Sequence, residues 1–327
     1  MKKLNVVYSS DENYSKLVMT SMVSLIENNK EFDKINVYVI SNGISPQSKE
    51  LTVSLAEGTN AEVIFIDFAE IEDKIYTDGN YSVSSYARLF LTQIIDEDYV
   101  IYMDCDSIVT GSLMPLVEDD FDNYAVGGVL DIVNPFFKTA LGLDEKSEYF
   151  NAGFLYINLD YWRKNDVENQ MKNYLVQCHG SVPHHDQGCI NAVLKGKIKR
   201  ISPKFNLQCP MFEFTPQELK KIEPAFYDKK ELDEAKNNPV FIHYTNGFYN
   251  RPWFKECSHP MVEDYRKYMK KVPGNSELKD IPLHKKAKLM RFIYNHFPFP
   301  IFNLYNSILT KRKAILLNRR YKKADKA

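Results

Sequence analysis

Two aspartates whose carboxylates could take part in chemistry, Asp104 and Asp106, directly follow an apolar run at residues 99–103. The run is typical of a buried β-strand. Residues two apart on an extended chain point to the same side, so both carboxylates can face one cavity at the strand end. Two close carboxylates repel each other unless a cation lies between them, and hard oxygen ligands suit Mg²⁺ or Mn²⁺. The pattern therefore predicts a site for a divalent cation.

The Asp-x-Asp pattern is weak evidence by itself, because it occurs three times, at residues 96–98, 104–106 and 120–122. The second copy alone has an apolar strand before it, which favours function there and solvated turns at the other two. Haloacid-dehalogenase-type phosphatases also place this pattern after a strand, with the first aspartate as nucleophile. Their site normally lies on the first strand of the domain, and Ile108 stands where they favour Thr or Val. A phosphatase with Asp104 as nucleophile is therefore the alternative enzyme.

A histidine, His243, follows a second apolar run at residues 240–242. A lone histidine at such a place is most often a hydrogen-bonded structural residue. Beside two carboxylates it gains another interpretation, because a neutral imidazole completes a mixed oxygen and nitrogen ligand set suited to Mn²⁺. Both interpretations of His243 stay open at this point.

The elements that must position these residues alternate between strands and helices. The spacing of apolar residues predicts, in order, strand 4–8, helix 15–28, strand 35–40, helix 45–58, strand 61–68, helix 84–95 and strand 99–103. Ser45 and Pro46 supply the second helix with a capping residue and a first-turn proline. Such alternation implies a parallel sheet covered by helices on both faces, with ligands bound at the carboxyl ends of the strands.

The chain beyond residue 130 is less regular in pattern. Further strands are predicted at 126–130, 154–159 and 240–244, and further helices at 161–178 and 186–195. From residue 258 the sequence is helical in pattern, and its last 44 residues carry twelve Lys and Arg against one acid. We therefore expect two parts. They are a catalytic domain at 1–257 and a helical, basic, amphipathic segment at 258–327.

The composition excludes several classes of protein. Five scattered cysteines, odd in number and never in a C-x-x-C pair, indicate reduced thiols and argue against a disulfide framework or a zinc site. Thirteen glycines leave no room for a long Gly-rich phosphate loop. No stretch reaches about 18 apolar residues, and the run at 4–8 is too short for a signal peptide. A cytoplasmic protein, soluble or peripherally attached to a membrane, is expected.

Six segments, in order along the chain, share their residues with one family of enzymes. They lie at 8–14, 84–89, 102–106, 149–153, 185–187 and 242–253. On these segments the chain resembles glycosyltransferase family 8, the retaining sugar transferases that include glycogenin and bacterial lipopolysaccharide α-galactosyl- and α-glucosyltransferases. The resemblance covers residues 4–257. It implies an α/β protein of the GT-A fold, with a Rossmann-like mixed sheet flanked by helices, a UDP-hexose donor, and Mn²⁺ or Mg²⁺ as cofactor.

The resemblance also implies roles for individual residues. Asp104, Asp106 and His243 would hold the metal, which would neutralise the UDP leaving group. The other residues that would contact the donor are Ser9, Asp11, Asn13, Arg88, Asn151, Ala152, Asp186, Gln187, Gly247 and Arg251. Gln187 would lie beside the anomeric carbon and stabilise the transition state through its carbonyl dipole. Because an amide is a poor nucleophile, attack by the acceptor on the same face as the departing UDP is favoured.

Several of these residues have simpler alternatives. Asp11 and Asn13 would read uracil and ribose, or would cap the N-terminus of the helix that follows. Arg88 would pair with sugar hydroxyls or phosphate, or would form a surface salt bridge. Asp186 would form hydrogen bonds with sugar hydroxyls as part of the catalytic site, or would complement the dipole of a helix.

The sequence departs from the family at several positions. Arg251 stands where many members have Lys, although a guanidinium still serves a diphosphate in bidentate fashion. The loop after His243 is longer than in the galactosyltransferases, so that Gly247 matches only with a gap. Asn80 stands where some relatives carry a sugar-binding histidine. The acceptor, a saccharide or a glycolipid, and the choice between galactose and glucose therefore stay open.

Two other functions are compatible with the resemblance. One is a sugar-nucleotide-binding relic without activity, which the joint presence of the metal residues and Gln187 argues against. The other is glycogenin-like self-glucosylation on a tyrosine. The basic tail suits a membrane glycolipid acceptor better than a self-acceptor.

The tail itself predicts attachment to a membrane. One apolar helix face comprises Ile301, Phe302, Leu304, Tyr305, Ile308 and Leu309. Basic runs at 311–313 and 319–323 follow it, which is typical of a helix lying in the interface of an anionic membrane, here the inner face of the cell membrane. The alternatives are a helix packed on the catalytic domain and a nucleic-acid-binding tail. A nucleic-acid tail needs no apolar face, so no nucleic-acid partner is expected.

Overall fold

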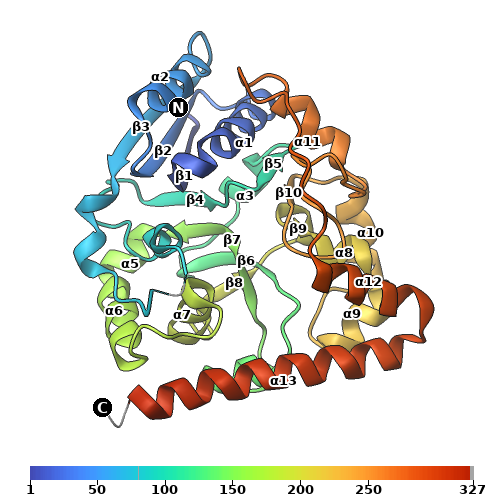
Figure 1. The fold of residues 1–327 in the computed structure, drawn as a ribbon. Helices are drawn as coiled ribbons and strands as arrows, with labels where there is room; N and C mark the ends of the chain where they lie inside the picture. The colour runs from blue at the N-terminus through green and yellow to red at the C-terminus, as the bar shows by residue number, and fades with distance from the viewer. Residues whose placement is uncertain (80, 325–327) are drawn as a thin grey trace.

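The computed structural model describes residues 1–79 and 81–324, and within the last helix it leaves aside the side chains of 313, 314 and 316–324. Asn80, noted above for its departure from the family, lies outside the described residues. So do the side chains of Lys313 and of the basic run at 319–323. Figure 1 shows the arrangement of the described elements.

A seven-stranded mixed sheet forms the centre of the molecule, in the order β3-β2-β1-β4-β7-β6-β8. Its strands are β1 (Lys3–Asp11), β2 (Lys34–Asn42), β3 (Ala61–Asp67), β4 (Tyr99–Met103), β6 (Val126–Leu130), β7 (Phe150–Asn158) and β8 (Ile198–Arg200). The first four are mutually parallel, as the alternation predicted. Strand β7 is antiparallel to both β4 and β6, which makes the sheet mixed. The predicted α/β class with a Rossmann-like mixed sheet is confirmed.

A second, three-stranded sheet has the order β5-β10-β9. Its strands are β5 (Ser107–Val109), β9 (Leu207–Gln208) and β10 (Phe241–His243). Strand β5 begins directly after Asp106, and β10 pairs antiparallel with it, so that His243 lies opposite Ser107. This pairing carries the histidine of a distant segment to the two aspartates.

The helices of the N-terminal part follow the predicted pattern, with one exception. Helix α1 (Ser15–Asn28) has the predicted bounds, and α2 (Pro46–Ser54) is capped by Ser45, whose hydroxyl accepts from the Ser48 amide. The helix predicted at 84–95 is wrong, because the chain forms a short 3₁₀ helix, η4 (Val83–Leu89), instead. Four consecutive residues at 86–89 are buried there, among them Arg88, whose side chain forms ion pairs with Asp104 and Asp186.

The long helix predicted at 161–178 is divided into α5 (Leu159–Lys164) and α6 (Val167–Gln177). Asp166 between them has φ 53, in the left-handed region that ends a right-handed helix. Helix α7 (His185–Val193) matches its predicted position. The remaining short helices are η1 (Glu12–Tyr14), η2 (Phe68–Glu70), η3 (Glu72–Lys74), α3 (Met114–Val117), α4 (Pro135–Ala140), η5 (Pro203–Phe205), α8 (Cys209–Glu213), α9 (Pro216–Ile222) and α10 (Lys229–Asn237).

Three helices follow the catalytic segments: α11 (Val262–Met269), α12 (Lys285–His296) and α13 (Phe299–Ala324). Helix α11 packs against α1, and α13 runs along one edge of the molecule (Figure 1). Among the helices of the described residues, none is both long and apolar enough to cross a membrane. The predicted apolar face of the tail is divided, because Phe302 is buried against the body while Ile301, Leu304 and Ile308 are exposed.

Candidate active site

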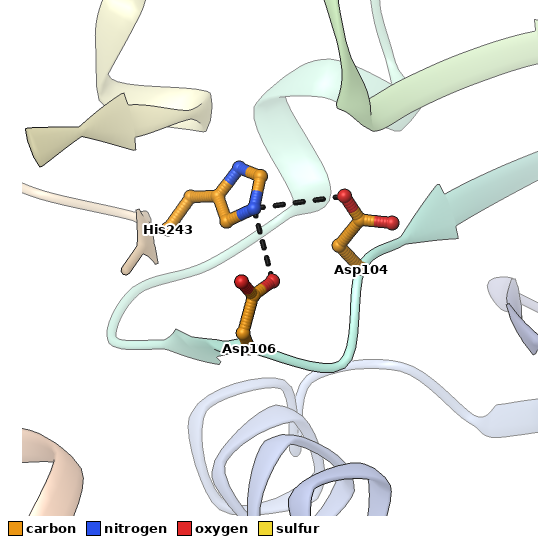
Figure 2. A group of neighbouring side chains, drawn as sticks. All are labelled: Asp104, Asp106 and His243. Carbon is orange, nitrogen blue, oxygen red and sulfur yellow. Dashed lines mark hydrogen bonds and ion pairs between the residues drawn. The ribbon is translucent and has the colours of Figure 1, made fainter. Parts of the chain in front are cut away.

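Three predicted metal ligands meet at the end of β4 (Figure 2). The ligand atoms of Asp104, Asp106 and His243 all lie within 4.8 Å of one another. His243 Nε2 is 3.0 Å from an oxygen of Asp106 and 3.6 Å from an oxygen of Asp104. Two carboxylates and one imidazole form a donor set that suits Mn²⁺ or Mg²⁺, so the residues present fit a divalent cation.

This close approach requires a glycine on the neighbouring strand. The Asp104 amide donates to the carbonyl of Gly153 in β7, at 2.8 Å. A Cβ atom at position 153 would lie 2.1 Å from Cε1 of His243 and 2.8 Å from an oxygen of Asp104. The glycine that ends the segment 149–153 therefore leaves the space in which the three predicted ligands meet.

Two arginines compensate the negative charge of the aspartates. Arg251 Nη1 donates to Asp106 Oδ2 at 2.7 Å, and Arg88 Nη2 donates to Asp104 Oδ1 at 2.8 Å. Burial alone would raise the pKa of Asp106, but the neighbouring His243 and Arg251 outweigh it and hold that pKa well below its usual range. Burial opposes protonation of His243, and the Asp106 carboxylate reverses this and raises the histidine's pKa.

Arg88 is a buried hub, which contradicts the alternative of a surface salt bridge. Its Nε lies 3.0 Å from Asp186 Oδ2, its guanidinium stacks 4.1 Å from the ring centre of Tyr102, and it donates to the carbonyl of Ala152. Burial raises the pKa of Asp186 to about 6, although Arg88 opposes the shift. Through Arg88 the structure connects Asp186 at the start of α7 with Asp104 at the end of β4.

The amide of Gln187 is fixed on both sides. Its Nε2 donates to Asp131 at 2.8 Å, and its Oε1 accepts from the Ala152 amide at 3.0 Å and from Asn151 at 3.3 Å. The sequence analysis missed Asp131, which directly follows β6. It could have been found by the rule that selected Asp104, a polar residue directly after an apolar strand.

A second residue that the sequence analysis missed is Asn206, which is fully buried. Its Oδ1 lies 3.2 Å from Nδ1 of His243, and its Nδ2 donates to Oδ1 of Asn151 at 2.9 Å. An Nδ1–H of His243 that donates to Asn206 leaves Nε2 as the acceptor facing the aspartates, which is how a neighbour orients a metal-binding histidine. A continuous chain of hydrogen bonds thus joins Asp131, Gln187, Asn151, Asn206 and His243.

The residues predicted at the nucleotide end lie at the end of β1 and on the loop after β10. Asp11 Oδ1 accepts from the Tyr14 amide at 3.2 Å, so Asp11 caps the short 3₁₀ helix η1, whereas α1, the helix that Asp11 and Asn13 were expected to cap in their alternative role, has no side-chain cap. Asn13, Gly247 and Arg251 line one cavity of about 1740 Å³. The hydroxyl of Ser9 is buried and has no hydrogen-bond partner among the described residues.

Comparison with known proteins shows which of them share this architecture. The galactosyltransferase LgtC, solved with donor and acceptor sugar analogues, shares the fold with a TM-score of 0.67 and 24% identity, over 87% of this chain and 99% of that one. The fold of this chain is therefore the GT-A fold. Residues 5–257 match the family described as glycosyl transferase family 8. The chain belongs to this family.

Two relatives are similar along most of their length. A putative glycosyltransferase of Haemophilus influenzae is 32% identical over 78% of this chain and 74% of its own. A lipopolysaccharide 1,2-glucosyltransferase of Escherichia coli is 25% identical over 87% of this chain and 82% of its own. Membership of the family confirms the resemblance drawn from the six segments and leaves the phosphatase alternative, with Asp104 as nucleophile, without support.

Proposed function

We propose that this protein is a metal-dependent, retaining glycosyltransferase that moves a hexose, galactose or glucose, from a UDP-sugar to a saccharide or glycolipid acceptor. One observation carries the proposal. Three side chains that fit a divalent metal lie together, and one chain of hydrogen bonds connects them to the amide of Gln187. The similarity to a lipopolysaccharide glucosyltransferase supports a place in the synthesis of cell-surface polysaccharide or lipopolysaccharide.

At the nucleotide end, Asp104, Asp106 and His243 would hold Mn²⁺ or Mg²⁺, which when bound would neutralise charge on the diphosphate. Arg251, which lies between Asp106 and the cavity, would bind a phosphate oxygen through its remaining guanidinium donors. Ser9, Asp11 and Asn13 at the end of β1 would contact the nucleoside, with Asp11 still capping its helix.

At the sugar end, Asp186 would accept from a hydroxyl of the hexose, and Asn151 and Ala152 would line the same pocket. Gln187 would lie beside the anomeric carbon. Its amide is held by Asp131 and Ala152 before any substrate binds, so its dipole needs no reorganisation in the transition state. The acceptor hydroxyl would attack on the face that UDP leaves, and its proton would pass to the departing phosphate oxygen.

The test is a screen of UDP-sugars for metal-dependent hydrolysis without acceptor. We expect Mn²⁺ to support hydrolysis of UDP-galactose or UDP-glucose, EDTA to stop it, and Asp104→Asn to lower it by at least about 100-fold, because one ligand charge is lost while the side-chain shape is kept. Full activity in EDTA would refute the metal-dependent enzyme. Binding of a UDP-sugar with neither hydrolysis nor transfer would favour the relic, and a β-linked product would refute retention.

We further propose that residues 258–327 attach the protein to the inner, anionic face of the cell membrane. The exposed apolar side chains of α13 are Ile301, Leu304, Ile308 and Ile315, spaced at helical intervals along one stripe, and exposed Lys311 and Arg312 lie beside it. Each basic residue near an anionic surface contributes about 1 kcal/mol, and the apolar stripe adds burial in the interface. A nucleic-acid-binding tail would not need this stripe.

A further inference from the structure

The loop that follows β10, residues 245–251, carries Arg251 to the metal site. Its start is fixed by β10, in which His243 pairs with the strand after Asp106. Its end is fixed by the Arg251 guanidinium, 2.7 Å from Asp106. We call this segment the Arg251 loop. Because it also lines the large cavity, its position decides whether Arg251 faces a bound diphosphate.

A single carboxylate holds the backbone at the middle of the Arg251 loop. The amides of Phe248 and Tyr249 donate to Glu213 at the end of α8. A Cβ atom at position 247 would lie 2.0 Å from Glu213 Oε1. Any residue other than glycine at this position would therefore collide with the carboxylate. Glu213 therefore holds the Arg251 loop against the end of α8.

The C-terminal helices contact the same loop through the ring of Phe248. The ring of Phe248 packs against Phe214 next to Glu213, Tyr294 of α12 and Phe302 of α13, with centroid distances of 5.4, 5.4 and 5.9 Å. Phe302 also contacts Phe214 at 5.6 Å and is 2% exposed, in a helix whose neighbouring apolar residues are exposed. Among the six residues of the predicted apolar face, Phe302 is the one fully buried against the body.

We infer that Phe302 is a positioning residue for donor binding, which holds the Arg251 loop closed through Phe248. The inference rests on the proposed use of a UDP-sugar. Without the ring of Phe302, Phe248 loses packing on one side, the loop leaves Glu213 more often, and Arg251 is withdrawn from Asp106. The C-terminal segment would then serve the site directly as well as attaching the protein to the membrane, and membrane contact at α13 would act on the Arg251 loop through Phe302.

The experiment compares three full-length variants. Phe302→Ala removes the ring, Phe302→Leu keeps an apolar side chain, and Leu304→Ala is the matched control, two residues away and 64% exposed. In calorimetric titrations with UDP and excess Mn²⁺, we expect Phe302→Ala to raise the UDP Kd about 5- to 30-fold and Phe302→Leu less than about 3-fold, while the control is unchanged. The donor KM of hydrolysis should rise more than kcat falls.

Hydrogen exchange of the protein without ligand gives a second readout that does not depend on the donor. The amides of Phe248 and Tyr249 should exchange faster in Phe302→Ala than in the native protein or in Leu304→Ala. A folded Phe302→Ala variant with native UDP affinity and native exchange at these amides would overturn the inference. If Phe302→Ala does not fold, hydrogen exchange in Phe302→Leu decides: the two amides should still exchange faster than in the native protein, because the aromatic contact with Phe248 is lost, and native exchange would overturn the inference. If the native protein binds no UDP, the proposed function fails, and exchange alone decides whether Phe302 holds the loop.

Discussion

The strand ends around Asp104 and the helix pair α12–α13 are built in opposite ways. At the strand ends, side chains such as Arg88, His243 and Asn206 are buried, and each has at least two polar partners. On α12 and α13, apolar side chains such as Phe292 and Leu304 are exposed. Under the proposed function, the strand ends would carry out the chemistry, and the exposed face of the helix pair would hold the protein at a membrane. Changes at the strand ends should alter catalysis, and changes on the exposed helix face should alter location.

The largest effect is expected for Gly153→Ala. The new methyl group would overlap His243 and Asp104, so the three ligands could not meet and the metal site would be displaced by an ångström or more. We expect transfer to fall by at least about 100-fold. Mn²⁺ affinity, measured by calorimetry, should fall in parallel, while sedimentation with anionic vesicles stays native. Native Mn²⁺ affinity in this variant would show that β7 does not confine the site.

A smaller loss is expected for Asn206→Ala, which removes the partner of His243 without touching the aspartates. Losing such a partner typically lowers metal affinity about 10- to 100-fold. Asn206→Asp is the informative companion, because a carboxylate still accepts from His243 Nδ1–H but cannot donate to Asn151. We expect the Asp variant to keep its Mn²⁺ affinity and to raise the donor KM. Equal behaviour of both variants would argue against two separate roles for this amide.

The other side of the comparison is tested by Leu304→Glu combined with Ile308→Glu. Both side chains are exposed on α13, so the fold should tolerate the change, but the membrane stripe would gain two negative charges and lose two apolar side chains. We expect binding to anionic vesicles to weaken at least about 10-fold, since burying one such side chain contributes about 1.5–3 kcal/mol. Donor hydrolysis in solution should not change. High salt should weaken native binding through screening. Native vesicle binding by the double variant would refute attachment through this stripe.

The smallest effect concerns the pH dependence of stability through Glu213. Burial raises the pKa of Glu213 from 4.5 to about 7, against the two amide donors that lower it. Between these pH values the folded protein binds more protons than the unfolded chain, so this group's contribution to the free energy of unfolding is full below about pH 4.5 and is lost as the pH rises to about 7. Glu213→Gln cannot ionise. Its melting temperature should match that of the native protein at pH 5 and exceed it by about 2–5 °C at pH 8. An equal difference at both pH values would show that Glu213 does not titrate in this range.

The sequence predicted Asp104 and His243, which follow apolar runs, but not Asp131, which follows the predicted strand β6 in the same way. Asp104 and His243 each end such a run, and β4 and α1 have their predicted bounds. Asn206 was missed because it follows a short 3₁₀ turn, η5, with no periodic pattern before it. Strands β5, β8 and β9 have only two or three residues, too few for an alternation to be recognised.

The orientation of α13 could not be predicted for a different physical reason. Ile301 and Phe302 are neighbours in the sequence and both apolar, so periodicity alone assigned them to one face. Their exposures, 49% and 2%, differ because Phe302 finds an aromatic cluster on the body and Ile301 does not. That cluster is assembled from Phe214, Phe248 and Tyr294, which lie on three separate segments, and no local pattern reveals which side of a helix will meet it.

The central place of β10 in the small sheet also has a consequence for how the protein is made. His243 is 137 residues away from Asp106 along the chain, and β10 is the strand that joins β5 to β9. The ribosome therefore adds both aspartates to the growing chain long before it adds the histidine. A nascent chain without β10 presents two of the three ligands and lacks Arg251. Because the cost of closing a loop grows only slowly with its length, this separation adds little to the cost of assembling the site. Under the proposed function, a chain that stops before residue 243 would lack one predicted ligand and would leave the cell's sugar nucleotides unused.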